Sequence, residues 1–305
     1  MQVNLSALET EQRNKNSENI DTMETEDILR VINREDKKVA GVVEGVIPQI
    51  TKVVDEACRR IQRGGRIFYI GAGTSGRLGV LDASECPPTY GVEPTLVQGI
   101  IAGGPQALVR SQEGAEDDME QAGRDLKARG LNGSDTVVGL AASGRTPYVV
   151  GGLEYAGKIG AFTAAVSCVR GAEISRHAEV PIEAVVGPEV VTGSTRMKSG
   201  TAQKLILNMI STAVMIHCGK VYRNLMVDVQ PTNAKLVERA RRIISESSGC
   251  GYEKAAALLE ASGRNVKVAI CMALTGLSKE KCAEILAGNG GNISRAIRSL
   301  TGKRP

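Results

Sequence analysis

A short apolar run that ends in three closely spaced glycines constrains this chain more than any other feature. Residues 67–70 (Ile-Phe-Tyr-Ile) are expected to form a buried strand, which stops at Gly71. Gly71, Gly73 and Gly76 allow a tight turn and let an anion come close to the backbone. Residues 76–84 are expected to begin a helix, whose free N–H groups would face the same anion. The sequence therefore predicts a phosphate-binding turn between a strand and a helix.

Two later turns resemble the first, because each carries hydroxyl side chains before an expected helix. Thr74 and Ser75 lie in the first turn, residues 141–148 form the second, and residues 187–204 contain the third. Each turn follows an expected parallel strand, and ligands in such sheets bind at the carboxyl ends of the strands. We therefore expect the three turns to share one rim of the sheet.

Strands and helices are expected to alternate along most of the chain. After the first strand, further strands are expected at residues 95–101, 135–140, 162–166 and 181–186, and helices at 39–61, 106–129 and 198–218. This order predicts an α/β fold, a five-stranded parallel sheet flanked by helices and doubly wound. We expect three parts, which are an N-terminal arm with helices (1–62), a sheet domain (63–230) and a helical module (231–305).

The helical module contains a small internal repeat. Residues 256–270 match residues 283–297, with Ala, Leu, Gly, Asn, Ala and Ile at the same offsets. Each copy is expected to form a helix, a glycine turn and a second helix, which is capped by Asn265 or Asn292. The module carries no candidate chemistry of its own.

Composition excludes several classes of function. Aromatic residues make up 3% of the chain, which disfavours a base-stacking nucleic-acid surface, and the net charge of +4 suits a small anionic substrate better than DNA or a membrane. The seven cysteines lack paired spacing and the two histidines stand outside any motif, so we expect reduced thiols and no metal site. No signal peptide or membrane-spanning run is visible, so we expect a cytoplasmic chain.

The glycine turn by itself leaves alternatives open, because dinucleotide-binding folds share the Gly-x-Gly-x-x-Gly pattern. No acidic residue ends the strand at 95–101 to hold a ribose, and no Gly-Lys-Ser/Thr follows a glycine turn to hold a triphosphate. Glu85 lies shortly after the turn, next to an expected break at Pro87-Pro88. Glu116 belongs to an acidic run, and spacing alone does not distinguish it from its neighbours.

Longer motifs surround these features. They cover residues 71–91, 113–117, 141–148, 187–204 and 224–229. With them, and with the Thr-Glu-x-Arg-Asn segment at residues 10–14, nearly the whole chain resembles the N-acetylmuramic acid 6-phosphate etherases, which have a sugar isomerase (SIS) domain. The resemblance implies an SIS-type sheet domain, a helical module similar to a UBA domain, and a cytoplasmic homodimer without a metal or an organic cofactor. Met197 and Ser199 are small departures from the family pattern.

The resemblance also implies a reaction and a set of residues. The family converts N-acetylmuramic acid 6-phosphate and water to N-acetylglucosamine 6-phosphate and D-lactate in the recycling of cell-wall sugars, with Glu85 and Glu116 as acid/base carboxylates. We assign the C2 proton to Glu85, and lactate departure and water addition to Glu116, although the roles can be swapped. We expect the substrate to be bound by residues of the three turns, which are Gly73, Thr74, Ser75, Ser143, Gly144, Thr146, Glu189, Ser194, Thr195 and Lys198.

Two other functions compete with this interpretation. A non-catalytic sugar-phosphate sensor of the glucokinase regulatory protein type need not keep the pair of carboxylates. A sugar-phosphate isomerase would need no acid to cleave an ether, and it would release no D-lactate.

Overall fold

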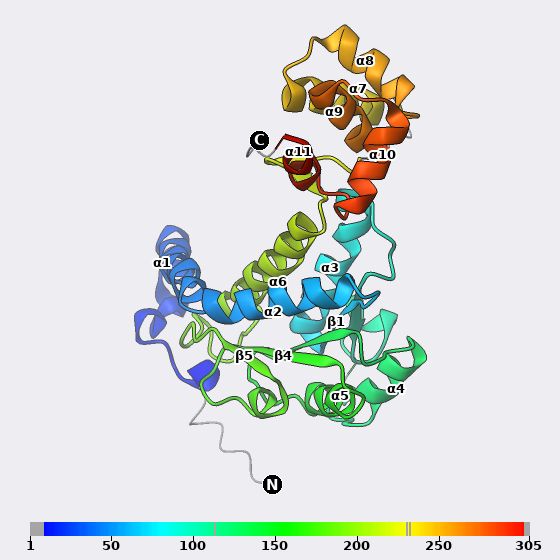
Figure 1. Ribbon diagram of the computed structural model, residues 1–305. Coiled ribbons are helices and arrows are strands. Elements are labelled where there is room, and N and C mark those ends of the chain that lie inside the picture. Colours follow the sequence, from blue (N-terminus) through cyan, green and yellow to red (C-terminus); the bar gives the residue numbers. More distant parts are fainter. Residues whose placement is uncertain (1–8, 113, 230, 232, 302–305) are drawn as a thin grey trace. The chain divides into compact units, whose positions relative to one another are not determined.

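The computed structural model describes residues 9–112, 114–229, 231 and 233–301, and Figure 1 shows its helices and strands. The chain divides into two compact units, of which the first is Met1–Ser84 with Pro94–Ser211 and the second is Glu85–Glu93 with Thr212–Pro305. The three-part division expected from the sequence stays a prediction. Glu113 of the acidic motif and residues 1–8 of the N-terminal arm lie outside the described residues.

The first unit is built on a five-stranded parallel sheet, which confirms the predicted fold class. Its strands lie in the order β2-β1-β3-β4-β5. They are β1 (Ile67–Gly71), β2 (Val97–Ile101), β3 (Thr136–Leu140), β4 (Phe162–Ser167) and β5 (Val180–Glu183). Parallel pairing aligns Gly71 at the end of β1 with Ile101 on one side and Leu140 on the other. The strand ends therefore form a common edge from which the turns leave.

Helices cover both faces of this sheet. Helices α4 (Gln121–Ala128) and α5 (Pro147–Lys158) lie on one face, and α2 (Ile47–Ile61) lies on the other with the first parts of α3 (Gly73–Tyr90) and α6 (Lys198–His217) (Figure 1). β1 and β3 are buried along their whole length, as apolar strands between two helical layers must be. Glycine brings α3 close to the sheet, because a Cβ on Gly99 would lie 2.4 Å from the Cα of Val80.

Two of the predicted helices differ from the structure at prolines. One is divided at a proline, and the other continues through two prolines. The helix predicted at 39–61 is two helices, α1 (Thr25–Glu44) and α2, because the ring of Pro48 cannot follow the preceding turn and starts a new helix instead. The expected break at Pro87-Pro88 is wrong, since α3 continues through both prolines to Tyr90. These prolines lie in the last turn of α3, which the N–H of Gly91 closes on the carbonyl of Pro87 at 2.9 Å.

The segment predicted as a helix at 106–129 is mostly not helical. It holds a short 3-10 helix, η5 (Pro105–Leu108), and α4, with turns between them. The intervening residues carry acidic side chains and few apolar ones, so they have no face to bury against the sheet. Gly114 also has a φ of +75°, which breaks a helix. This non-helical stretch carries Glu116.

The described part of the N-terminal arm packs against the loop that follows β5. It forms three 3-10 turns, Glu9–Glu11, Lys15–Ser17 and Ile20–Thr22. The side-chain amide of Asn14 donates to the carbonyl of Pro188 at 3.1 Å, and the hydroxyl of Ser17 donates to the carbonyl of Val190 at 2.7 Å. The arm therefore supports the third predicted turn.

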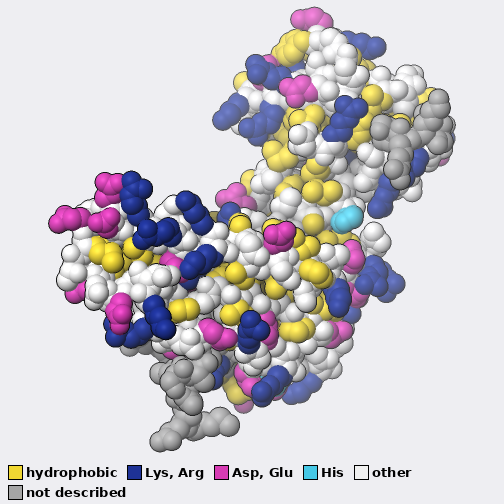
Figure 2. All heavy atoms as spheres, turned by 90° about the vertical axis from the view of Figure 1, so that its left-hand side faces the viewer, with side chains coloured by type: hydrophobic (Ala, Val, Ile, Leu, Met, Phe, Trp, Pro, Cys, Tyr) yellow, Lys and Arg dark blue, Asp and Glu magenta, His cyan; other side chains and the backbone are white. Residues whose placement is uncertain are grey.

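The second unit is helical apart from a short hairpin, β6 (Val221–Tyr222) and β7 (Leu225–Met226). Its further helices are α7 (Ala234–Ser248), α8 (Tyr252–Ala261), α9 (Val266–Thr275), α10 (Lys279–Gly288) and α11 (Ile293–Thr301). The predicted repeat is confirmed, because Asn265 caps α9 and Asn292 accepts a hydrogen bond in the first turn of α11. Basic and acidic side chains are interspersed on the face shown in Figure 2. No helix among the described residues is long and apolar enough to cross a membrane.

Candidate functional site

Close backbone packing forms the turn between β1 and α3. A Cβ on Gly76 would lie 2.6 Å from the carbonyl oxygen of Gly71 and 2.7 Å from the side chain of Ile101, so only glycine fits there. Gly73 has a φ of +52°, which glycine adopts without strain, and the position where a Cβ would stand is open. The glycines thus have two roles: Gly76 closes the turn and Gly73 leaves space beside it.

Helix α3 begins at Gly73, three residues earlier than predicted, so the predicted anion-binding residues form its first turn. The first amides of a helix have no partner within it. Among the described residues, no side chain accepts a hydrogen bond from the N–H of Gly73, Thr74 or Ser75. These donors and the positive end of the helix dipole are suited to an anion.

Ser75 is buried and faces α6. Its hydroxyl donates to Oε1 of Gln203 at 2.8 Å. Two turns further along α3, the carboxylate of Asp82 accepts from Nδ2 of Asn208 at 2.6 Å and from the hydroxyl of Ser211 at 3.1 Å. Burial raises the pKa of Asp82 above its ordinary value. Polar contacts therefore fix α3 and α6 to each other at two levels.

A hollow of about 210 Å³ opens beside the first turn of α3 and brings Gly73 and Glu116 together. Its lining residues come from the turn before α3, from α3 itself and from the segment that follows β2. They are Ala72, Gly73, Arg77, Ala102, Ala107, Ser111, Gln112, Gly114, Ala115 and Glu116. Arg77 holds that segment in place, because its guanidinium donates to the carbonyls of Ala107 and Leu108. The hollow thus combines helix N–H donors, a guanidinium and one exposed carboxylate.

The second predicted turn is tied to the same segment by the backbone. The carbonyl of Glu116 accepts from the N–H of Tyr148 in the first turn of α5, at 2.9 Å. Ser143 and Thr146 lie in the turn just before α5, and Gly144 has a φ of +69° there. A Cβ on Gly144 would lie 2.4 Å from the Cβ of Ala172, so this turn also requires glycine.

The third turn supplies an anion from within the protein. Glu189 is fully buried, and its carboxylate accepts from the N–H groups of Lys198 and Ser199 and from the Ser199 hydroxyl, at 2.9–3.0 Å. It therefore caps the start of α6. Ser194 and Thr195 are partly buried in the turn that leads to this helix.

Lys198 also has a partner inside the protein. Lys198 is 1% exposed, and its ammonium donates to Glu35 of α1 at 2.6 Å. Burial opposes the charged form of Glu35, but hydrogen bonds from Lys198, Lys38 and Asn16 lower its pKa to about 2. The contacts of Glu189 and Lys198 position α6, and a direct contact of either side chain with substrate stays a prediction.

The second predicted carboxylate does not line the hollow. Glu85 is exposed and lies ten residues after Ser75 on α3, which corresponds to about 15 Å of helix. The structure thus brings together Gly73 and Glu116, and it joins the Glu116 segment to the turn of Ser143 and Thr146. Sequence reasoning missed Arg77, Ser111 and Gln112, of which only Arg77 stands inside the quoted glycine motif.

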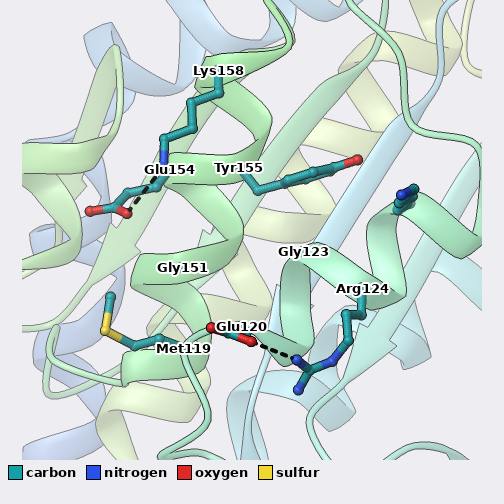
Figure 3. A pocket seen from close by; sticks show the side chains of 9 residues that line it. Met119, Glu120, Gly123, Arg124, Gly151, Glu154, Tyr155 and Lys158 are labelled. Atoms are coloured by element: carbon teal, nitrogen blue, oxygen red, sulfur yellow. Dashed lines mark hydrogen bonds and ion pairs between the residues drawn. The ribbon is translucent and has the colours of Figure 1, made fainter.

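A larger hollow of about 390 Å³ lies between α4 and α5 (Figure 3). Two ion pairs line it. Glu120, just before α4, pairs with Arg124 of α4, and Glu154 pairs with Lys158 within α5. None of the predicted site residues lines it. The described residues also contain no group of three or more His, Cys, Asp or Glu side chains that could hold a metal ion.

Comparisons with known proteins agree with the resemblance seen in the sequence. The glucokinase regulatory protein N-terminal SIS domain family matches residues 49–157. An N-acetylmuramic acid 6-phosphate etherase of Clostridium botulinum is 62% identical, over 96% of this chain and 97% of that protein. One of Cronobacter sakazakii is 54% identical, over 97% of this chain and all of that protein.

Among solved structures, a phosphoheptose isomerase from Neisseria gonorrhoeae superimposes with a TM-score of 0.48 at 13% identity. The superposition covers 63% of this chain and 98% of that one. The sequence relatives, which match almost end to end, are far more similar to this chain.

Proposed function

The chain belongs to the N-acetylmuramic acid 6-phosphate etherase family, and from this premise we propose how its residues carry out the family's reaction. The enzyme is a carbon–oxygen lyase of amino-sugar metabolism, which converts N-acetylmuramic acid 6-phosphate and water to N-acetylglucosamine 6-phosphate and D-lactate. A sensor of the glucokinase regulatory protein type is not favoured, because relatives more than 50% identical along almost the whole chain are etherases. The hollow that joins Gly73 to Glu116 is the observation that supports the site.

The reaction needs an acid and a base at neighbouring carbons. In the open-chain sugar, the aldehyde at C1 acidifies the C2–H bond. A base removes this proton, the C2–C3 double bond forms, and lactate leaves from C3 as an acid protonates its ether oxygen. Water then adds to C3 of the unsaturated aldehyde and a proton returns to C2. Two carboxylates are sufficient for these steps if one is protonated when the other is ionised.

The first turn of α3 binds the 6-phosphate. Its free N–H groups and the space beside Gly73 support this assignment, and Ser75 lies in the same turn. We assign the hydroxyls of Ser143 and Thr146 to the phosphate as well, because their turn leads into α5, whose Tyr148 N–H donates to the carbonyl of Glu116. With the phosphate at this end of the hollow, the sugar carbons extend along the Glu116 segment.

Glu116 is the acid/base group of the hollow, with its carboxylate beside the leaving lactate. Glu116→Gln removes that proton transfer, and we expect D-lactate release to fall by about two to four powers of ten. Asp117→Asn is the matched control, since it changes the neighbouring charge and should leave the rate within about twofold. Comparable D-lactate release by wild type and Glu116→Gln would contradict the assignment.

Glu85 acts at C2, and the active unit is a homodimer in which each site takes Glu85 from one copy and Glu116 from the other. Glu85 lies about 15 Å along α3 from Ser75 and does not line the hollow that holds Gly73 and Glu116. In the proposed dimer, the second copy supplies this carboxylate. Glu85→Gln should then stop the exchange of the C2 proton with deuterium from the solvent, and unchanged exchange would contradict its role as the base.

Subunit mixing tests the shared site. When inactive Glu85→Gln and Glu116→Gln proteins are mixed and their subunits redistribute, about a quarter of the wild-type activity should return, because half of the dimers are mixed and one of their two sites is intact. Glu85→Gln mixed with the double variant is the control and should stay inactive. If the mixture of single variants also stays inactive, each site is formed within one chain.

A further inference from the structure

The buried side-chain amide of Gln203, which contacts Ser75 in the first turn of α3, has an NH₂ group without a hydrogen-bond partner among the described residues. Gln203 of α6 is 0% exposed, and its Oε1 accepts the Ser75 hydroxyl. Its Nε2 is also buried, and within the described part of the chain it has no hydrogen-bond partner. An unpaired buried donor costs about 1–3 kcal/mol, so such a group calls for an explanation.

The hydrogen bond of Ser75 runs in the wrong direction for phosphate binding. A serine hydroxyl has one proton and two lone pairs. In this structure the proton points to Oε1 of Gln203 and away from the free N–H groups of the helix turn. Ser75 can donate to a phosphate oxygen only if it releases Gln203, and Oε1 of Gln203 would then face a lone pair of the hydroxyl.

We propose that Gln203 is a positioning residue that sets the direction of the Ser75 proton. When phosphate binds, the carboxamide turns over, Nε2 donates to the Ser75 oxygen, and Ser75 donates its proton to the phosphate. The chain of hydrogen bonds then runs from Gln203 through Ser75 to the ligand. The buried Nε2 gains an acceptor, while Oε1 releases the Ser75 proton and takes the place that Nε2 had. This inference rests on the proposed phosphate site at the first turn of α3.

The surroundings of Gln203 allow its side-chain amide to rotate by half a turn about its terminal bond. The oxygen and the NH₂ group of a carboxamide are similar in size, so their exchange needs little change in packing. The helices themselves are fixed, because Asp82 joins α3 to Asn208 and Ser211 of α6. Near the turn, the methyl group of Thr74 lies 3.5 Å from the position a Cβ would take on Gly200 of α6. The carboxamide can therefore reverse while both helix starts remain in place.

Gln203→Met tests the proposal, because methionine has a similar length and neither donates nor accepts strongly. Loss of the unpaired donor should leave the melting temperature of the free protein unchanged or higher. The affinity for N-acetylglucosamine 6-phosphate should fall about three- to tenfold, as expected for one hydrogen bond. KM should rise by a larger factor than kcat falls. A purely structural Gln203 would instead give a lower melting temperature with unchanged affinity for the product, and that result would overturn the proposal.

A double-mutant cycle with Ser75→Ala checks that Gln203 acts through the serine. In the Ser75→Ala protein, Gln203→Met should cause no further loss of product affinity, whereas equal losses in both backgrounds would overturn the proposal.

The wild-type enzyme separates this inference from the proposed function. If wild type releases no D-lactate and does not bind the product, the proposed function fails. If wild type does both and Gln203→Met binds the product as tightly as wild type, the proposed function stands and the role of Gln203 is wrong.

Discussion

Helices α3 and α6 both begin at the strand ends of the first unit, but their first N–H groups have different partners. The start of α6 is capped by the buried carboxylate of Glu189, and its first residue, Lys198, is ion-paired with Glu35. The start of α3 has no such carboxylate among the described residues, and it opens beside Gly73 onto a hollow. The positive end of α6 is already paired with a carboxylate of the protein itself, so this helix has a structural role. The positive end of α3 has no such partner among the described residues, so it can attract an anionic ligand. The proposal that α3, and not α6, binds the substrate rests on this difference.

Removal of the α6 cap should give the largest loss of stability among the variants of these two helix starts. Glu189→Gln replaces an ionised acceptor of three hydrogen bonds with an amide whose NH₂ group faces N–H donors. We expect the free energy of unfolding to fall by about 4 kcal/mol. Urea denaturation of wild type and Glu189→Gln measures this loss. An unchanged midpoint would mean that the first turn of α6 does not depend on its internal anion.

The ion pair at the start of α6 should make the first unit sensitive to acid. The pKa of Glu35 is about 2 in the folded protein, below its ordinary value of 4.5, so the ionised carboxylate stabilises the fold above about pH 5. This contribution, about 3 kcal/mol, is lost as the pH falls from about 4.5 towards 2. Thermal melting at a series of pH values should show a shallower acid-induced decline for Glu35→Gln than for wild type. Parallel declines would contradict the role of Glu35.

A serine at the start of α6 gives the smallest expected effect. The Ser199 hydroxyl supplies only one of the hydrogen bonds to Glu189, at 2.9 Å. Ser199→Ala should therefore lower the free energy of unfolding by about 1 kcal/mol, which chemical denaturation can measure. A loss as large as that of Glu189→Gln would mean that the hydroxyl, and not the backbone N–H groups, dominates the cap.

Much of the fold was predictable, because it depends on patterns local in sequence. Apolar strands that end at glycine, such as Ile67–Gly71, specified the sheet and its edge, and the repeat around Asn265 and Asn292 specified its own caps. The predicted helix boundaries were wrong where the effect of a residue depends on its position in the helix. The same residue type starts α2 at Pro48 and is tolerated in the last turn of α3 at Pro87.

The site was less predictable, because its contacts join residues far apart in the chain. Glu116 could be chosen from its acidic run only by family resemblance, and its place beside Gly73 required the fold. Lys198 was predicted as a substrate contact, yet its partner Glu35 lies 163 residues away and cannot be read from spacing. Gln203 is one of several polar residues of α6, and only the tertiary structure shows its unpaired donor next to Ser75.

Titration of N-acetylglucosamine 6-phosphate into two matched serine variants tests the difference between the two helix starts most directly. Ser75→Ala removes a hydroxyl from the first turn of α3, and Ser199→Ala removes one from the first turn of α6. We predict that Ser75→Ala weakens product binding by about 10- to 100-fold, as expected for a hydrogen bond to a charged group, and that Ser199→Ala leaves the Kd within about twofold of wild type. Unchanged binding by Ser75→Ala, or equal weakening by both variants, would contradict the assignment of the phosphate to α3.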